Sequence, residues 1–432
     1  MTDPLWLGTT SARDPQTPPV DRLRMGEQGE LSLPEALRRS WGLAPGAEIA
    51  LQETPQGLLL RRADPALTRV YVEPTARCNL SCRTCVRRAW SEPEGTMDMA
   101  TYRRLLAGLR GVPSLRSVAF WGFGEPLLHP HIVEMVALAR ELGARTELIT
   151  NGLLLDRGVA EGLVLAGLDT LVVSVDGTTP QAHADVRPQA DLRRVQENLG
   201  FLQALRDRLA RRGPEIGLEF VAMRRNVAEL PRLPHLAYAL GASFLVITNL
   251  LPHTEEMKDQ ILYGLWAGSS YPRHPSAGAP EIILPRIDAQ PDARGPLLEL
   301  LRHVGVVGPD PRRLSGAPGY CRFVGEGALA VGWDGAVSPC VALMHSYPCY
   351  VMGRPKRIRR YVLGNVDADD VSAIWQRDEF VRFRARVLAF DFSPCTDCGG
   401  CEMAETNEED CFGNPFPVCG DCLWAKGVLQ CP

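Results

Sequence analysis

The sequence predicts an α/β protein: an open, partial (β/α)6 barrel of parallel strands, preceded by a small β-rich domain and followed by a cysteine-rich domain. Between residues 69 and 252, strand-like and helix-like runs alternate. Repeated βα units of this kind form a parallel sheet with right-handed crossovers, and six strands are too few to close an eight-stranded barrel. The thirteen cysteines divide into three at 78–85 and ten at 321–431. This clustering is not typical of cysteines that simply fill a core.

The elements of the barrel follow from the hydrophobic pattern. The expected strands are residues 69–74, 117–126, 145–152, 169–177, 216–223 and 242–252. The expected helices are residues 99–111, 131–143, 158–168, 191–213 and 226–241. We therefore place the barrel at residues 68–255. Residues 256–320 are rich in Pro and Gly and are expected to be an irregular linker that covers a substrate opening, while residues 321–432 form the cysteine-rich domain.

Composition and charge narrow the classes of function. The chain of 432 residues is 45% hydrophobic and 23% charged, which is ordinary for a globular protein. Its net charge of −4 gives no global positive field, so nucleic acid is not an expected partner. The chain shows neither a secretory signal nor an apolar run long enough for a membrane helix. We expect a cytoplasmic protein without a membrane partner, whose clustered, reduced thiols bind zinc or iron–sulfur clusters.

The N-terminal part is expected to hold a disordered tail, residues 1–19, and a compact domain, residues 20–63. The pattern predicts a strand at 29–34, a short helix at 34–41 and two closing strands at 43–53 and 55–62. This order resembles the swapped-hairpin domain of AbrB/MazE-type transcription factors, which implies a homodimer or the docking of a protein partner. Six Arg balance six acidic residues in this domain, so it lacks a phosphate-binding face.

The first three cysteines, Cys78, Cys82 and Cys85, follow the first barrel strand in a C-x3-C-x2-C spacing. They lie in the loop at its carboxyl end, where parallel barrels place their chemistry. Three thiolates can hold three irons of a [4Fe–4S] cluster and leave the fourth iron open. A zinc site with a fourth ligand elsewhere is the alternative. The spacing resembles that of the radical S-adenosylmethionine (SAM) enzymes, which implies a partial TIM-like barrel.

Two further motifs extend this resemblance. In WGFGEP, residues Gly122, Phe123, Gly124 and Glu125 match the Gly-Gly-Glu-Pro motif that contacts the amino group of SAM, with one residue of departure. Ser174 and Asp176 stand where the family places groups near the ribose, whereas the adenine motif of the fifth strand is not clear here. The resemblance implies that the open iron binds the methionine part of SAM. One electron then cleaves SAM to methionine and a 5′-deoxyadenosyl radical, which abstracts a substrate hydrogen.

The C-terminal cysteines begin with Cys321-x13-Gly335-x4-Cys340. This spacing and the segment 363–387 resemble the SPASM extension of radical SAM maturases, which implies two auxiliary [4Fe–4S] clusters. The resemblance assigns Cys321 and Cys340 to the first cluster and Cys395, Cys398 and Cys431 to the second, without dividing the other ligands. The full set of expected ligands is Cys321, Cys340, Cys395, Cys398, Cys401, Cys411, Cys419, Cys422 and Cys431. A zinc ribbon built from two C-x2-C pairs, at 395–398 and 419–422, is the alternative.

Two polar stretches have simpler interpretations. His129 and His131 begin a helix, where a surface or capping role is expected. The basic run at 354–360 is expected to be a solvated loop, and the alternative is a docking site for an acidic electron donor or a phosphate-bearing substrate.

The segments 248–263 and 411–432 resemble the maturases, or cofactor-modifying proteins, of tungsten-dependent aldehyde:ferredoxin oxidoreductases. The implied substrate is a tungsten oxidoreductase or its tungstopterin cofactor, and the implied electron donor is ferredoxin or flavodoxin. One alternative is a peptide maturase that forms thioether or carbon–carbon crosslinks. A remote alternative is a zinc-binding, AbrB-like transcription regulator, which predicts zinc, no SAM cleavage and salt-sensitive DNA binding.

Overall fold

The computed structural model describes the chain in segments: residues 30–35, 38, 49–54, 57–62, 65–210, 213–263, 281–283, 291–302, 306–307, 319–396 and 401–430. The chain divides into two compact units, Met1–Ala47 and Glu48–Pro432. The predicted tail at 1–19 lies outside the described residues, as does most of the predicted helix at 34–41. Residues 30–34 of the predicted strand at 29–34 are described, and they form no strand beyond a single bridge residue, Leu31. The second unit holds every element discussed below.

The second unit begins with a β-hairpin. Strands β1 (Ile49–Thr54) and β2 (Gly57–Arg62) pair antiparallel, with Thr54 opposite Gly57 at the turn. The two closing strands predicted for the N-terminal domain are therefore confirmed. The AbrB-like identity of that domain stays a prediction.

The six predicted strands of the barrel are present and lie side by side in chain order within one sheet. They are β3 (Arg69–Val72), β4 (Ser117–Phe120), β5 (Arg145–Thr150), β6 (Thr170–Ser174), β7 (Glu215–Ala222) and β8 (Phe244–Asn249). Each pairs parallel with its neighbour. Every residue of β4 and β6 is buried, as expected for strands covered on both faces.

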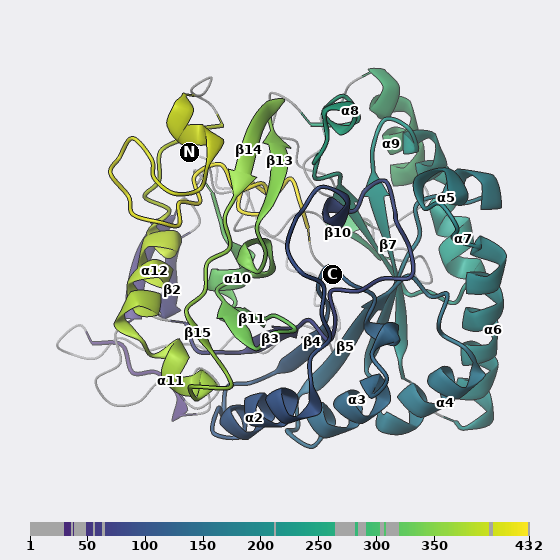
Figure 1. Cartoon of the computed structure of the whole chain (residues 1–432), viewed down its shortest axis with the longest axis horizontal. Coiled ribbons are helices and arrows are strands. Elements are labelled where there is room, and N and C mark those ends of the chain that lie inside the picture. Colours follow the sequence, from purple (N-terminus) through teal and green to yellow (C-terminus); the bar gives the residue numbers. More distant parts are fainter. Residues whose placement is uncertain are drawn as a thin grey trace, which may run out of the picture. The chain divides into compact units, whose positions relative to one another are not determined.

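Helices connect these strands and cover the sheet (Figure 1). They are α2 (Met99–Leu109), α3 (Ile132–Arg140), α4 (Arg157–Ala166), α5 (Pro180–Val186), α6 (Leu192–Arg208) and α7 (Leu233–Ala239), with 3-10 turns η1 (Val86–Arg88), η2 (Pro126–Leu128) and η3 (Val227–Arg232). Aspartates at the N-caps of α2, α4 and α6 accept hydrogen bonds from the first turn, which satisfies otherwise unpaired N–H groups. The sequence missed α5, a short helix that follows the fourth strand. No helix in the described part of the chain combines the length and apolar character needed to cross a bilayer.

The segment 256–320, expected to be irregular, contains regular elements among its described residues. These are α8 (Glu255–Lys258), β9 (Glu281–Ile283), α9 (Pro291–Arg302) and β10 (Val306–Val307). Strand β9 pairs parallel with β8, and β10 pairs parallel with β9. The parallel sheet therefore continues beyond the six predicted strands. Strands this short carry too little periodicity to be recognised among Pro and Gly.

The C-terminal domain joins the same sheet at its other edge. Strand β11 (Ala328–Val331) pairs parallel with β3, and β12 (Ala336–Ser338) and β15 (Gly364–Asn365) follow antiparallel. The remaining elements are α10 (Arg322–Gly325), η5 (Val341–Leu343), the hairpin β13 (Tyr347–Val351) and β14 (Arg354–Ile358), α11 (Val371–Trp375), α12 (Asp378–Ala389) and η6 (Glu402–Glu405). Barrel and cysteine-rich domain are thus one continuous sheet.

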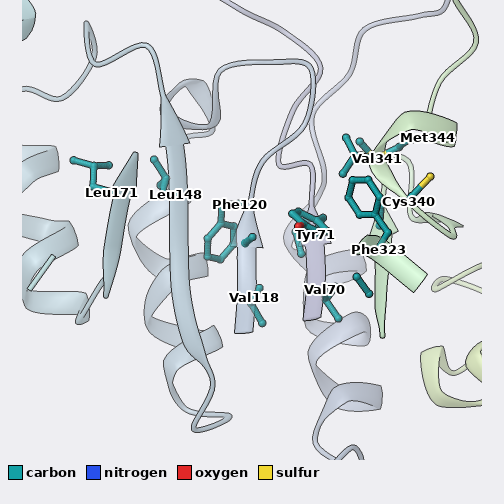
Figure 2. Close-up of a cluster of buried hydrophobic side chains, with 14 of the residues drawn as sticks. Val70, Tyr71, Val118, Phe120, Leu148, Leu171, Phe323, Cys340, Val341 and Met344 are labelled. Atoms are coloured by element: carbon teal, nitrogen blue, oxygen red, sulfur yellow. The ribbon is translucent and has the colours of Figure 1, made fainter. Parts of the chain in front are cut away.

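Apolar side chains fill the seam between these two parts (Figure 2). Tyr71 of β3 packs edge-on against Phe323 of α10, with ring centroids 5.6 Å apart. Figure 2 shows Cys340 and Val341 on the same side of the seam as Phe323. Burying one large apolar side chain contributes roughly 1.5–3 kcal/mol, so this seam holds the cysteine-rich domain firmly on the first barrel strand.

Candidate functional site

One cavity gathers nearly all of the predicted SAM-site residues. It opens at the carboxyl ends of β3, β4 and β6, and its lining includes Cys78, Cys82, Cys85, Gly122, Phe123, Gly124, Glu125 and Ser174. Asp176 is the exception, because it is fully buried and does not line the cavity. The motifs that follow one another along the chain therefore meet in one cavity of the folded protein.

Hydrogen bonds to neighbouring loops hold the cysteine loop. The backbone N–H of Arg83 donates to the carbonyl of Val186 at 2.9 Å, and its Nε donates to the carbonyl of Asp185 at 2.7 Å. On the other side, Asn151 Nδ2 donates to Asn79 Oδ1 at 2.8 Å. These contacts fix the loop that carries the three thiols to the end of α5 and to the end of β5.

The three thiols are close enough to influence one another's protonation. Burial raises the pKa of Cys82 to about 11, and the charges of Cys85 and Cys78 add to the increase while Arg187 opposes it. No three His, Cys, Asp or Glu in the described segments are placed around one metal ion. All three thiols line the same cavity, and three thiolates can hold three irons of a [4Fe–4S] cluster.

Two glycines allow the motif after β4 to approach the cysteine loop. A Cβ on Gly124 would lie 2.0 Å from the carbonyl oxygen of Thr75 and 2.6 Å from that of Arg77. A Cβ on Gly122 would lie 2.4 Å from Cγ of Glu73. Next to Gly124, the backbone N–H of Glu125 donates to the carbonyl of Arg77 at 2.8 Å. Glycine is required at 124 because the two main chains touch, and at 122 because the Glu73 side chain fills the place of a Cβ.

Glu125 ties its own loop to the end of β5 from inside the fold. Its side chain accepts hydrogen bonds from the Thr150 hydroxyl at 2.6 Å, the Asn151 backbone N–H at 2.8 Å and the Leu127 backbone N–H at 3.0 Å. Burial raises the pKa of Glu125, while these donors oppose the increase. The carboxylate therefore orders the end of β5 as well as the cavity wall.

The sequence missed a buried cation at this site. Arg187 lines the cavity, and its Nε donates to Asp176 Oδ2 at 2.7 Å. Asp176 Oδ1 also accepts from the backbone N–H of Val221 at 2.9 Å. Asp176 therefore lies behind Arg187 and orients it. Arg187 stands beyond the end of α5, where no local motif marks it.

Glu219 of β7 is a second residue that the sequence did not assign. It lines the cavity and accepts a hydrogen bond from the Ser174 hydroxyl at 3.0 Å. Burial raises the pKa of Glu219 to about 7, against the opposing effects of Ser174 and Arg187. A carboxyl group that titrates near neutrality thus faces the same cavity as the three thiols.

A buried Glu–His–Glu network connects the cavity wall to the C-terminal domain. His345, in the turn before β13, pairs through Nε2 with Glu73 Oε2 and through Nδ1 with Glu92 Oε2, both at 2.8 Å. The other oxygen of Glu73 accepts from the backbone N–H of Phe123 at 2.9 Å. Trp90 packs on His345 with ring centroids 4.6 Å apart. The C-terminal domain thereby holds the motif after β4 in place.

This network predicts a pH dependence of stability. Burial alone would lower the pKa of His345, but hydrogen bonds to Glu73 and Glu92 outweigh burial and raise it from 6.5 to about 9. A raised pKa stabilises the fold fully below the ordinary pKa, and that contribution disappears as pH rises through the raised value. The contribution is on the order of 3 kcal/mol. We expect the melting temperature of the wild type to fall as pH rises to about 9.

The variant His345→Gln supplies the control for this prediction. Glutamine can still form hydrogen bonds but cannot carry the charge. The melting temperature of the variant should therefore be lower than that of the wild type near neutral pH, and it should change less with pH. The difference in melting temperature between the wild type and the variant should become smaller in alkaline solution. Parallel melting curves over the whole pH range would show that the His345 charge does not stabilise the fold.

A second, apolar cavity lies in the C-terminal domain and gathers five thiols. Cys321, Cys340, Cys349, Cys419 and Cys422 line it. Burial raises the pKa of Cys340 well above its usual value, and the charges of Cys321, Cys422 and Cys419 add to the increase. The pair at 419–422 thus lies with Cys321 and Cys340. A zinc ribbon would instead join that pair to the one at 395–398.

The other C-terminal cysteines lie elsewhere or outside the described residues. Cys395 is buried and its Sγ lies 2.8 Å from the Ser393 hydroxyl, whereas Cys401 and Cys411 are exposed. Cys398 and Cys431 lie outside the described residues. The second ligand set that the sequence proposed therefore remains a prediction.

The basic run at 354–360 is a structural element and not the expected solvated loop. It forms β14, and Lys356 is buried with its Nζ 2.8 Å from Asp421 Oδ2. Arg354 donates to the carbonyl of Cys395 at 2.6 Å, and Arg360 pairs with Asp334 at 3.1 Å. These contacts pack the hairpin against the cysteine-bearing loops.

His131 stands at the start of α3 as the sequence predicted, whereas His129 is not at the surface. His129 is buried and its Nε2 lies 2.8 Å from the carbonyl of Met97. His131 occupies the N-cap position of α3, and its backbone N–H donates to His129 Nδ1 at 3.1 Å.

Comparison with known proteins identifies the family. The model of the Radical SAM superfamily matches residues 72–207, and that of the SPASM iron–sulfur cluster-binding domain matches residues 321–402. The tungsten-containing aldehyde ferredoxin oxidoreductase cofactor-modifying protein of Pyrococcus furiosus is 31% identical over 367 residues, covering 84% of this chain and 96% of that protein. The chain belongs to the radical SAM superfamily. This radical SAM enzyme uses SAM and iron–sulfur clusters as cofactors, and two auxiliary clusters fit its SPASM domain.

Other radical SAM proteins resemble the chain over most of its length. The PqqA peptide cyclase of Xanthomonas axonopodis pv. citri is 28% identical over 375 residues, covering 85% of this chain and 88% of the cyclase. The structure of histidine-tagged anSMEcpe with bound AdoMet superposes with a TM-score of 0.53 at 16% identity, covering 84% of this chain and 92% of that one. This structural likeness confirms the predicted fold class, a partial barrel with a SPASM domain.

Proposed function

We propose that this enzyme is a maturase that uses SAM-derived radical chemistry to modify a tungsten oxidoreductase or its tungstopterin cofactor. The similarity to the cofactor-modifying protein carries this proposal, because it spans 84% of this chain and 96% of the relative. Membership of the radical SAM superfamily alone would not identify the substrate.

Each side chain of the first cavity has a defined part in this proposal. Cys78, Cys82 and Cys85 hold the SAM-binding cluster. When bound, the cluster supplies the electron that cleaves SAM to methionine and a 5′-deoxyadenosyl radical. The close approach at Gly122 and Gly124 holds the motif after β4 against the cysteine loop, so that both face the methionine end of SAM.

Polar groups deeper in the cavity fit the rest of SAM. Arg187 offers a buried positive charge, which suits the carboxylate of the methionine part. Ser174 and Glu219 offer hydrogen-bonding oxygens that suit the ribose hydroxyls. Asp176 contributes by orienting Arg187 and not by contacting SAM.

The auxiliary ligand set follows from the second cavity. We assign Cys321, Cys340, Cys419 and Cys422 to one auxiliary cluster, because they line the same apolar cavity. Four thiolates complete a [4Fe–4S] cluster. Cys349 lines this cavity too but is surplus to the four. Electrons for the enzyme come from a ferredoxin or flavodoxin, and the expected compartment is the cytoplasm.

A peptide maturase is the second candidate, because the PqqA peptide cyclase resembles the chain over 85% of its length. One experiment separates the two. The reconstituted enzyme is reduced with dithionite and given SAM, and 5′-deoxyadenosine is measured with the apo form of a tungsten oxidoreductase, with its isolated tungstopterin, or with a short Cys- or Gly-rich peptide.

The proposal predicts that the oxidoreductase or its cofactor stimulates 5′-deoxyadenosine formation several-fold and changes in mass. Stimulation and mass change with the peptide alone would replace this proposal by peptide maturation.

A further inference from the structure

The last residues of the described chain form one wall of the SAM cavity. Trp424, Leu429 and Gln430 line the cavity together with Thr248 and Asn249 at the carboxyl end of β8. The three cluster cysteines and the motif after β4 line the remainder. The cavity therefore has a part that suits SAM and a second part, beside β8, that belongs to neither motif.

Hydrogen bonds fasten this C-terminal wall to the barrel. Asn249 Nδ2 donates to the carbonyl of Val428 at 2.8 Å, and the backbone N–H of Gln430 donates to the Thr248 hydroxyl at 2.9 Å. Within the turn, the backbone N–H of Val428 donates to the carbonyl of Leu423 at 2.9 Å. The wall is thus a fixed part of the site.

Gln430 is the unusual residue of this wall. Its side chain is only 6% exposed, and among the residues that the structure describes its amide nitrogen has no hydrogen-bond partner. Leaving such a group unsatisfied costs roughly 1–3 kcal/mol, so buried amides almost always have a partner. A residue at the edge of a ligand cavity can obtain that partner from the ligand.

The chemistry of the wall indicates what the ligand offers. Thr248, Asn249, Leu251, Trp424, Leu429 and Gln430 are all uncharged. The charges of the cavity lie elsewhere, on Glu125, Glu219 and Arg187, and Arg187 is already paired with Asp176. A neutral amide donor in a cavity that an indole also lines suits a neutral, planar acceptor and not a carboxylate or phosphate.

We propose that Gln430 is a substrate-recognition residue that donates a hydrogen bond to an amide-type carbonyl of the substrate, seated between β8 and Trp424. Such a carbonyl occurs in the lactam ring of a pterin and in a peptide bond. This assignment rests on the proposed function, since it takes the cavity as the place where SAM and substrate meet.

The test measures probe binding to the reconstituted, SAM-loaded full-length enzyme by calorimetry. The probes are neopterin, which carries a pterin lactam, and N-acetylglycine amide, which carries peptide-type carbonyls. The wild type should bind one of them, which identifies the source of the carbonyl. Gln430→Leu should weaken that binding by about tenfold, the equivalent of one lost hydrogen bond.

Two further variants make the result decisive. Gln430→Glu keeps the shape of the side chain but places a carboxylate opposite the substrate carbonyl, so it should also weaken probe binding. This variant replaces Gln430→Leu in the test if the leucine variant does not fold. Gln376→Leu, at an exposed position after α11, should bind the probe as the wild type does.

Equal probe affinity in the wild type and both Gln430 variants would overturn the assignment, and so would a wild type that binds neither probe. A separate measurement tests the proposed function: it fails if the wild-type enzyme does not cleave SAM when reduced with dithionite.

Discussion

Cys82→Ala is expected to abolish reductive SAM cleavage while leaving the auxiliary iron in place. Cys82 is the most buried of the three thiols in the cysteine loop, and Arg187 lies close enough to lower its pKa against the effect of burial. Alanine removes a cluster ligand and leaves one iron without a thiolate. The measurement is 5′-deoxyadenosine formed from SAM under dithionite, together with the iron content of the same sample.

A matched control exists for this substitution. Cys349 is also buried, but it is surplus to the four thiols assigned to its cavity. Cys349→Ala should therefore retain the wild-type iron content. Full SAM cleavage by Cys82→Ala would remove the assignment of the SAM cluster to this loop.

Gly124→Ala should disable the SAM site through the backbone alone. The added methyl group would meet two main-chain carbonyl oxygens, of Thr75 at 2.0 Å and of Arg77 at 2.6 Å. Neither can swing aside as a side chain would, so the cysteine loop must separate from the motif after β4. Overpacking of this kind costs roughly 1–3 kcal/mol, and the hydrogen bond from Glu125 to Arg77 would be lost as well.

The measurement for this variant is SAM affinity of the reconstituted enzyme, with the melting temperature recorded on the same protein. We expect affinity to fall by about a hundredfold or more, which corresponds to about 2.7 kcal/mol. Gly200→Ala is the control, because nothing lies within 4 Å of its added methyl group in α6. That variant should bind SAM normally and be about 1 kcal/mol more stable. Wild-type SAM affinity in Gly124→Ala would contradict the role given to this close contact.

The barrel was predictable because its strands carry a strong local signal. Every residue of β6 is buried, and its three central residues, Leu171, Val172 and Val173, are apolar. Strands β9 and β10 were missed, since three and two residues are too few for a periodic pattern. Their place in the sheet depends on pairing with β8, which is a long-range contact.

The site was predictable where residues follow one another in a motif. The three cysteines and the motif at 122–125 were recognised from spacing, and they do line one cavity. Arg187, Glu219 and the network around His345 were not, because each depends on packing between distant segments. The same reason explains Asp176, which the motif order places at the cavity but which the fold turns toward Arg187.

The division of the C-terminal cysteines also depends on tertiary structure. The pairs 395–398 and 419–422 have the same spacing, so spacing alone allows a zinc ribbon. The fold brings Cys419 and Cys422 to Cys321 and Cys340, about a hundred residues away along the chain. No local pattern contains that information.

The most direct test of the account is the anaerobic iron, sulfide and zinc content of the reconstituted enzyme and of the Cys78/Cys82/Cys85→Ala triple variant. We predict about twelve irons in the wild type and about eight in the variant, because each [4Fe–4S] cluster contributes four. About eight falling to about four would leave a single auxiliary cluster. About four irons with one zinc, falling to zinc alone, would contradict the account, since the C-terminal thiols would then bind zinc and not auxiliary clusters.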